Sequence, residues 1–441
     1  MRTLLKLVFG TVLCIFSTSS LNAIELSKAI AADYDAHLGP LFEHFHANPE
    51  LSTVEHNTAA RMAQELTDVG FEVTTGVGGT GVVAILKNGE GPMVSMRADM
   101  DGLPVEEKSG LAYASKATQV DPITGNEVFV MHACGHDVHI TSLVGTARLM
   151  YATRDQWSGT LMLIVQPAEE RVLGAKAMME DNLYQRFGTP DFGLALHVSS
   201  GIEAGKIGVT DGSPYAGADT VDIKIHGVGA HGASPHAGKD PIVLGAQIVM
   251  ALQTLVAREL PPRDPGVVTV GSFHAGTKHN IISDQATLQL TVRNTSLETR
   301  KTLLDGIKRI AVNMGRVAGL PEDKLPEVVV SQESVPPTIN NPELAQRLRG
   351  VWVEKMGEDI LTKRPNKGMG AEDYPFFTTD PYIPSVYFAV GGTPEEDFKA
   401  ADAGGQPVPS HHSPLFKITP KPAVTSGVEA TVLGLMELLG K

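Results

Sequence analysis

Cysteine is scarce in this chain of 441 residues, which contains only Cys14 and Cys134. The first lies in an N-terminal stretch typical of an export signal, with two early basic residues and a mostly apolar run over 4–16. We predict that residues 1–23 are a signal peptide and that the mature protein is periplasmic or secreted; a retained anchor is the alternative. Cleavage would leave one thiol in an oxidising compartment, which excludes an internal disulfide.

Long apolar runs and basic clusters are also missing. No stretch after residue 23 suggests a membrane span, so we expect no stable span after signal cleavage. The net charge is −14 and no basic run offsets it. We therefore expect neither nucleic acid nor an anionic membrane as a partner. The length of 441 residues favours two domains.

Metal-ligand side chains, by contrast, are concentrated around Cys134. The stretch Met131–His139 contains one thiol, three imidazoles and one carboxylate. Gly135 permits a tight turn through which Cys134 and His136 could reach one ion. Apolar residues at helical spacing follow over 140–150, so the turn is predicted to open a helix. Metal ligation would also protect a lone thiol from oxidation; the alternative is a buried cysteine beside surface histidines.

Predicted strands and helices alternate along the chain, which indicates an α/β layer architecture. Polar residues follow three of the predicted strands, where open α/β sheets place their sites. They are Asp99 and Asp101 after residues 93–96, Glu169 and Glu170 after 159–165, and His197 after 191–196.

Taken alone, each of these positions allows two interpretations. The neighbours Glu169 and Glu170 are costly to bury without a cation, and in a metal site one can ligate while the other acts as general base. They could equally form an acidic helix N-terminus, because the residues from 171 to 182 are predicted to be helical. We expect Asp101 in a solvated turn and Asp99 in a supporting position. A lone strand-end histidine such as His197 is more often structural than a ligand.

The composition changes at residues 210–218, a Gly-, Ser- and Pro-bearing stretch that could be a hinge. The order strand, helix, two strands, helix from 219 to about 325 predicts a small α+β domain inserted in the larger one. We place the insert at 212–326 and the catalytic domain at 24–211 and 327–441. The later catalytic segment is predicted to contain helices over 342–356 and 420–439.

Six stretches, in this order, resemble the M20 metallopeptidase family, specifically its aminoacylase-like amidohydrolase branch. That branch includes hippurate hydrolases, N-acyl-amino-acid amidohydrolases and plant auxin-conjugate hydrolases. The resemblance implies a catalytic domain like that of metal-dependent exopeptidases, with a central mixed sheet flanked by helices, and an inserted lid or dimerisation domain. The stretches begin at Arg97, His132, Gln166, Leu196, Gly229 and His412, and the resemblance covers essentially the whole mature chain.

The resemblance implies one or two divalent ions per subunit. Zinc suits a mixed sulfur, nitrogen and oxygen set best, with manganese or cobalt as alternatives. Arg97 stands where the wider family carries a ligand histidine and Cys134 where it carries a bridging aspartate, which leaves open whether both metal positions are filled. The implied ligands are Cys134, Glu170 and His412 for one ion, and Cys134, His136 and His197 for the other.

The resemblance also implies roles for residues outside the ligand set. Glu169 would be the general base, with Asp99 supporting the site. His231 would stabilise the oxyanion, often from the neighbouring protomer, which implies a homodimer through the inserted domain. The carboxylate end of the substrate would meet Asn280, Gly370 and Glu372.

The predicted reaction is therefore hydrolysis of N-acyl-amino acids, hippurate-like or related conjugates, by metal-activated water. A dipeptidase or carboxypeptidase acting on dipeptides, or a deacetylase of acetylated diaminopimelate, is the alternative within the family. A non-catalytic binding protein on the same scaffold is the rival of another class. That rival predicts loss of the base or of a ligand, whereas Glu169 and all five ligands are present.

Overall fold

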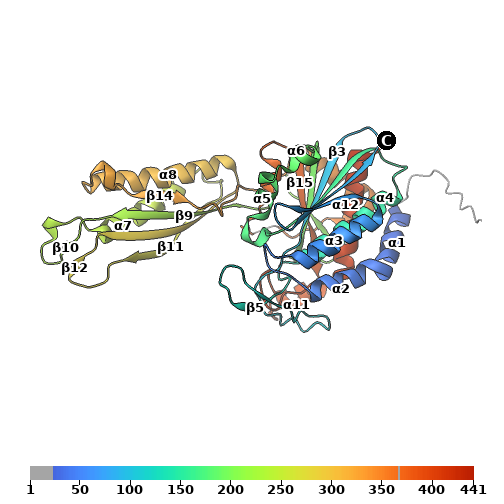
Figure 1. The fold of residues 1–441 in the computed structure, drawn as a ribbon, viewed down its shortest axis with the longest axis horizontal. Helices are drawn as coiled ribbons and strands as arrows, with labels where there is room; N and C mark the ends of the chain where they lie inside the picture. The colour runs from blue at the N-terminus through green and yellow to red at the C-terminus, as the bar shows by residue number, and fades with distance from the viewer. Residues whose placement is uncertain (1–22, 366–367) are drawn as a thin grey trace, which may run out of the picture.

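The computed structural model describes residues 23–365 and 368–441, so the predicted signal peptide, apart from Ala23, lies outside the described residues. The chain forms a larger body and a narrower one that extends from it (Figure 1). The larger body is built on a seven-stranded sheet and the narrower one on a four-stranded sheet.

The seven-stranded sheet is mixed, as predicted. Its middle strands β6, β3, β7 and β15 run parallel to one another, and β1, β2 and β8 pair antiparallel at the two sides. In sheet order the strands are β1 (Glu72–Val77), β2 (Gly81–Asn88), β6 (Gly159–Gln166), β3 (Met93–Asp99), β7 (Phe192–Glu203), β15 (Ser385–Thr393) and β8 (Ile207–Gly208).

Helices cover both faces of this sheet. Successive strand residues point to opposite sides, so the apolar side chains of one strand enter two separate cores. On β6, Leu161, Leu163 and Val165 join one core, whereas Met162 and Ile164 join the other. The first core is closed by α1 (Ala23–Asp33), the π-helix η1 (Tyr34–Leu38), α2 (Gly39–Ala47), α3 (His56–Val69), α4 (His136–Ala152), α9 (Pro342–Met356) and α12 (Pro420–Leu439). The second is closed by α5 (Gly174–Glu180), α6 (Leu183–Phe187) and α10 (Pro375–Thr378).

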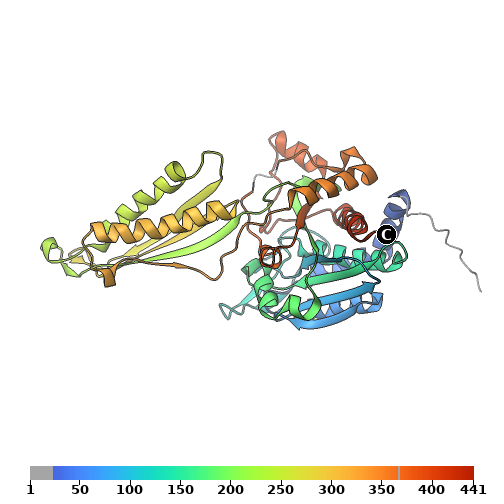
Figure 2. The same ribbon diagram turned by 90° about the horizontal axis from the view of Figure 1, so that it is seen from above.

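The narrower body is an antiparallel sheet with helices on one face (Figure 2). A separate core joins sheet and helices, so the sheet's other face is free to be polar. Its strands in order are β11 (Gly266–Ala275), β13 (Gln285–Asn294), β9 (Gly217–His226) and β14 (Glu327–Val330); its helices are α7 (Pro241–Thr254), the π-helix η4 (Leu255–Glu259) and α8 (Leu297–Val317). Since β14 pairs with β9, this sheet extends past the predicted boundary at residue 326.

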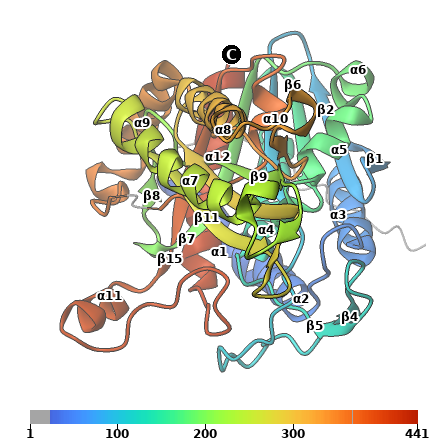
Figure 3. The same ribbon diagram turned by 90° about the vertical axis from the view of Figure 1, so that its left-hand side faces the viewer.

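Several short elements lie at the margins. The strands β10 (Ala230–His231) and β12 (Ile281–Ile282) form the tip of the narrower body, remote from the larger body (Figure 1). Seen from that tip, α11 (Glu395–Asp402) and the hairpin of β4 (Thr118–Val120) and β5 (Glu127–Phe129) lie at the periphery (Figure 3). The remaining short helices are η2 (Glu169–Arg171), η3 (Pro235–Ala237), η5 (Glu322–Lys324) and η6 (Glu358–Ile360).

Three sequence expectations need correction. The predicted helix over 171–182 is interrupted, because Val172 has a positive φ of 50° and α5 begins only at Gly174. The strand predicted to end at residue 196 continues to Glu203, so His197 lies within β7.

The third correction concerns the expectation that no stretch after residue 23 suggests a membrane span. Two helical stretches, Pro241–Glu259 and Pro420–Leu439, are long and apolar enough to cross a membrane by length and composition. Core helices pass the same test, and the second stretch is 67% buried in its most apolar window.

Candidate metal centre and active site

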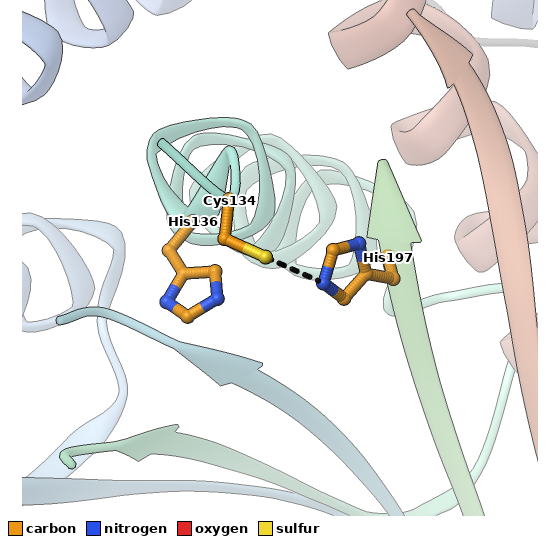
Figure 4. A group of neighbouring side chains, drawn as sticks. All are labelled: Cys134, His136 and His197. Carbon is orange, nitrogen blue, oxygen red and sulfur yellow. Dashed lines mark hydrogen bonds between the residues drawn. The ribbon is translucent and has the colours of Figure 1, made fainter. Parts of the chain in front are cut away.

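The candidate site lies where the parallel strands of the larger sheet end, as expected for an open α/β sheet. Asp99 is the last residue of β3, and η2, with Glu169 and Glu170, follows β6 closely. Cys134 projects from the turn before α4 toward His197 on β7, and His136, the first residue of α4, lies beside it (Figure 4).

Glycine in that turn is required by both conformation and space. Gly135 has a φ of 82°, a left-handed conformation that costs glycine little. A Cβ at this position would lie 2.3 Å from Cγ1 of Val198. The helix α4 begins at the next residue, His136, which confirms the prediction that the Cys134 turn opens a helix.

Two groups of potential metal donors share the Cys134 thiol. Cys134, Glu170 and His412 form one group, and Cys134, His136 and His197 form the other; within each group the donor atoms lie within 4.8 Å of one another. The Cys134 Sγ–His197 Nε2 distance is 3.6 Å, and the His412 Nε2–Glu170 Oε2 distance is 3.4 Å. Donors bound about 2.0–2.3 Å from one tetrahedral ion stand roughly 3.3–3.7 Å apart. The structure thus brings all five predicted ligands together.

The imidazoles are oriented for ligation. Nδ1 of His197 donates to the carbonyl of Val198 at 2.6 Å, so the lone pair lies on Nε2, which faces the Cys134 sulfur. Nδ1 of His136 faces Oδ1 of Asp101 at 3.3 Å, which leaves Nε2 toward the carboxylates of Glu169 and Glu170, 3.8 and 3.9 Å away. A carboxylate or carbonyl behind each ring is the usual support of a ligand histidine.

Buried donor atoms without a hydrogen-bond partner, and negative charge without a compensating positive charge, show that these residues fit a divalent cation. Among the described residues, Oε1 of Glu170 and Nε2 of His136 are buried without a hydrogen-bond partner, which is costly unless an ion satisfies them. Burial, reinforced by the charges of Glu170 and Glu169, raises the pKa of the Cys134 thiol well above its usual range. A thiolate at this position therefore requires a positive charge beside it.

Glu169 lies in a surplus of negative charge. Burial, together with the charges of Glu372 and Glu170, raises the pKa of Glu169 well above its usual range. Burial is also the main reason that the pKa of Glu170 is raised to about 8. A carboxyl group with a raised pKa holds a proton more readily than an ordinary carboxylate, which suits a group that takes a proton and returns it.

Asp99 connects the donor cluster to a buried arginine. Its carboxylate binds Nδ1 of His139 at 2.5 Å and Nη1 of Arg97 at 2.6 Å, and it lies 3.7 Å from Nε2 of His136. Burial alone would raise the pKa of Asp99, but the positive charges of Arg97 and His136 outweigh it and hold the pKa well below its usual range. Asp99 is therefore a fixed anion behind the cluster, as a supporting residue should be.

The predicted pocket residues of the larger body have internal partners. Glu372 is 1% exposed and binds Nη2 of Arg97 at 2.7 Å and the Tyr387 hydroxyl at 2.6 Å. The carbonyl of Gly370 accepts from the amide of Ala216 at 2.8 Å. Their role toward a substrate stays a prediction.

Asp101 corrects the prediction of a solvated turn, because its side chain is 1% exposed. It accepts hydrogen bonds from the Ser52 hydroxyl at 2.6 Å and from the amides of Glu169 and Glu170, both at 3.1 Å. It thus fixes the backbone that presents both glutamates and faces the His136 ring. Its spacing of two from Asp99 was an available signal, since alternate residues of an extended segment share a face.

The structure does not bring His231 or Asn280 to the donor cluster. Both are exposed at the tip of the narrower body, where Gly232 donates to the carbonyl of Asn280 at 2.8 Å. The sequence reasoning assigned no role to His139 or His411, whose rings lie beside His197 at centroid distances of 4.4 and 5.3 Å.

The sequence of residues 95–403 matches the peptidase family M20/M25/M40. The chain therefore belongs to this family of hydrolases, and the resemblance inferred from its motifs is confirmed.

Its relatives place it among the metal-dependent amidohydrolases of that family. It is 38% identical to a hippurate hydrolase of Campylobacter jejuni over 333 residues, which cover 75% of this chain and 82% of the relative. It is 36% identical to thermostable carboxypeptidase 2 of Saccharolobus solfataricus over 351 residues, 78% of this chain and 83% of the relative.

A solved structure agrees with the fold and with the donor cluster. The Bacillus subtilis protein YxeP, described as a dinuclear metal-binding peptidase of the M20 family, has a TM-score of 0.73 and 26% identity. The match covers 93% of this chain and 99% of YxeP. A metal-binding hydrolase with a mixed central sheet is thus supported by sequence and structure independently.

Proposed function

We propose that this protein is an exported amidohydrolase that cleaves the amide bond of N-acyl-amino acids, hippurate-like or related conjugates. The observation that carries the proposal is the pair of three-donor groups that share Cys134, with Glu169 beside them. In this assignment Cys134, Glu170 and His412 hold one ion and Cys134, His136 and His197 the other, with zinc favoured by the mixed donor set.

The chain's own residues supply the proton transfers. A divalent ion in this cluster would provide Lewis acidity and an activated water. The Glu169 carboxylate accepts a proton from the attacking water and returns it to the leaving amine. Asp101 holds the amide of Glu169, and Asp99 keeps a fixed negative charge beside Nε2 of His136.

The substrate class rests on the similarity to hippurate hydrolase and on the polar loop that carries Gly370 and Glu372. The carboxypeptidase relative supports a second candidate, hydrolysis of dipeptides, and a diaminopimelate-type deacetylase belongs to the same alternative. Both classes present an amide bond and a neighbouring carboxylate, so the ligand cluster alone does not separate them.

A release assay separates these candidates. The purified protein, reconstituted with zinc, manganese or cobalt, would be offered N-benzoyl, N-acetyl and indole-acetyl amino acids beside dipeptides and N-acetyl-diaminopimelate. We expect the highest kcat/KM on an N-acyl-amino acid and loss of that activity on chelation. Preference for dipeptides would favour the second candidate, and metal-loaded protein that cleaves nothing would favour a binding protein.

In this proposal His231 of another subunit completes the site by donating a hydrogen bond to the oxyanion, with Asn280 beside it.

The face of α7 that points away from its own sheet supports a homodimer through the narrower body. That face exposes 53% of Val243 and 71% of Met250, while Ile248 and Leu252 are fully buried on the other side. Exposed apolar patches of this kind mark association sites. The Met250→Asp variant should be monomeric in sedimentation equilibrium, whereas the wild type should be a dimer.

Export is proposed from the charged start and short apolar run of residues 1–23. The mature chain would then retain Cys134 alone, held by metal. Fractionation of expressing cells and N-terminal sequencing would test this, with the mature protein expected to begin near residue 24. A full-length protein that stays in the cytoplasm would contradict export.

A further inference from the structure

Cys134 has a second imidazole neighbour that the proposed function does not use. Nδ1 of His411 lies 3.6 Å from the Cys134 sulfur, the same distance as Nε2 of His197. The two rings approach the sulfur from different segments, His197 from β7 and His411 from the coil that precedes α12.

The backbone decides which nitrogen of His411 carries the proton. The amide of Ser200, in β7, donates to Nε2 of His411 at 3.2 Å. A ring nitrogen that accepts a hydrogen bond has no proton of its own, so the proton of the neutral ring is on Nδ1. The Nδ1–H group therefore faces the Cys134 sulfur at 3.6 Å, and the backbone of Cys134 is a second hydrogen-bond partner of the ring.

His197 shows the opposite arrangement at the same sulfur. Its Nδ1 donates to a carbonyl, so it offers a lone pair from Nε2. Among the described residues, His197 belongs to a group of potential metal donors whose atoms lie within 4.8 Å of one another, and His411 belongs to none. One histidine beside Cys134 is therefore oriented as a ligand and the other as a hydrogen-bond donor.

The His411 ring is held in place on several sides. It packs on Phe416 with a centroid distance of 4.8 Å. The next residue is anchored too, because the amide of His412 donates to the carbonyl of Ala133 at 2.8 Å. The dipeptide is thus fixed to the Cys134 turn, with His412 directed to Glu170 and His411 to the sulfur.

We propose that His411 is a positioning residue that donates an N–H···S hydrogen bond to the Cys134 thiolate shared by the two metal groups. The proposal rests on the proposed function, in which Cys134 binds metal as a thiolate. A hydrogen bond to a charged sulfur fixes the side chain of Cys134. It also withdraws negative charge from the sulfur, so that ions bound there keep more Lewis acidity for the reaction.

Isosteric variants of His411 separate its two nitrogens. In His411→Asn the side-chain amide can replace Nδ1 as donor to sulfur, whereas in His411→Gln the amide oxygen can replace Nε2 as acceptor from Ser200 and the donor is lost. His411→Phe removes both contacts. The probe is the cobalt-substituted protein, whose sulfur-to-cobalt charge-transfer band reports the electron density on the thiolate.

We expect the band to move to longer wavelength in His411→Gln and His411→Phe and to stay near the wild-type position in His411→Asn. Turnover should fall about 10- to 100-fold in Gln and Phe, mainly in kcat, the usual cost of losing a group behind a metal ligand. Bound cobalt should remain stoichiometric. His236→Gln, an exposed histidine of the tip, is the matched control and should leave band and turnover unchanged.

The possible outcomes assign failure to one proposal or the other. An unchanged band in Gln, or equal shifts in Asn and Gln, would overturn the hydrogen bond to sulfur. Loss of bound cobalt in Gln would make His411 a ligand and also overturn it. Absence of any sulfur-to-cobalt band in the wild type would instead remove Cys134 from the ligand set and so contradict the proposed function. If His411→Phe fails to fold, the Asn and Gln variants still decide the question.

Discussion

The donor cluster and the tip of the narrower body contrast in how far each is preassembled. At the cluster, Asp99 and Asp101 are at most 1% exposed and bind the groups around them. At the tip, His231 is exposed, and its ring accepts a hydrogen bond from the amide of Ala233 at 3.0 Å. Burial fixes donors before a ligand arrives, whereas an exposed group must be brought to the reaction by closure or by a partner.

The difference indicates a division of labour. Metal binding and proton transfer need fixed distances, which the large core beneath the cluster supplies. Oxyanion stabilisation and release of product benefit from a movable group, and the narrower body has its own core. Substitutions in the cluster should therefore alter chemistry and metal binding together, while those at the tip should alter chemistry alone.

The largest effect is expected at the base. Glu169→Gln should lower kcat by about 10²–10⁴ because it removes the proton acceptor, with metal content unchanged in elemental analysis. The paired variant Glu170→Gln should instead lose metal. If Glu169→Gln retains more than about a hundredth of the wild-type rate, the base lies elsewhere.

At the tip, His231→Ala should lower turnover on the order of 10²–10³, the usual cost of one oxyanion donor, and should leave bound metal unchanged. His236→Ala changes an exposed histidine of the same tip, is the matched control and should leave turnover nearly unchanged.

Donation across a dimer makes a further prediction: a mixture of His231→Ala and Glu169→Gln should regain activity, because mixed dimers contain one complete site. Confirmed heterodimers without activity would exclude donation across the interface.

A smaller effect should follow from loosening the cluster without removing a ligand. The Asp101→Asn variant replaces one carboxylate oxygen by an amide nitrogen, which donates hydrogen bonds and cannot accept them. The side chain then loses the acceptor for one of the two amides, those of Glu169 and Glu170. We expect metal affinity to fall about 10- to 100-fold in competition with a chelator. Asp222→Asn, the same change on the exposed face of β9, should not alter it; equal affinities in the two variants would remove Asp101 from the support of the site.

The sequence predicted the elements whose signals are local. The last helix predicted for the inserted domain is observed as α8, and Ser296 caps it by accepting from the amide of Thr299. Helix α9 likewise begins after the cap Asn341. The ligand residues were found because their types and order carry the family resemblance.

What was missed depends on burial, which distant segments create. Asp101 reads as a turn residue until Ser52 and η2 close over it. The direction of the His411 proton follows from an amide of β7, about two hundred residues away in the chain. Spacing within one segment contains no such information, so only the assembled fold could assign these roles.

The contact between His46 and the first turn of α4 should make a pH-dependent contribution to stability. His46 lies between Asp137 and Glu107, with Nδ1–Oδ2 and Nε2–Oε1 distances of 2.7 and 3.1 Å. Burial lowers the pKa of His46, but hydrogen bonds to Asp137 and Glu107 outweigh it and raise the pKa from 6.5 to about 10. This stabilisation is complete below the unfolded-state pKa and is lost as pH rises through the folded-state pKa. The loss of unfolding free energy in His46→Gln should therefore shrink between about pH 6.5 and 10 in urea titrations; a difference independent of pH would contradict the assignment.

The smallest expected effect tests whether the two bodies are stabilised independently of each other. Ser296→Ala removes the N-cap of α8, whose accepted hydrogen bond from Thr299 measures 3.1 Å, and should cost about 1 kcal/mol of the stability of the narrower body. Ser296→Asp, which keeps a capping oxygen, should restore most of that loss. Neither variant should alter metal affinity, because the core beneath α8 shares no residue with the core beneath the cluster. Weakened metal binding in Ser296→Ala alone would show that the narrower body helps to hold the cluster together, and the division between a fixed cluster and a movable donor would then be wrong.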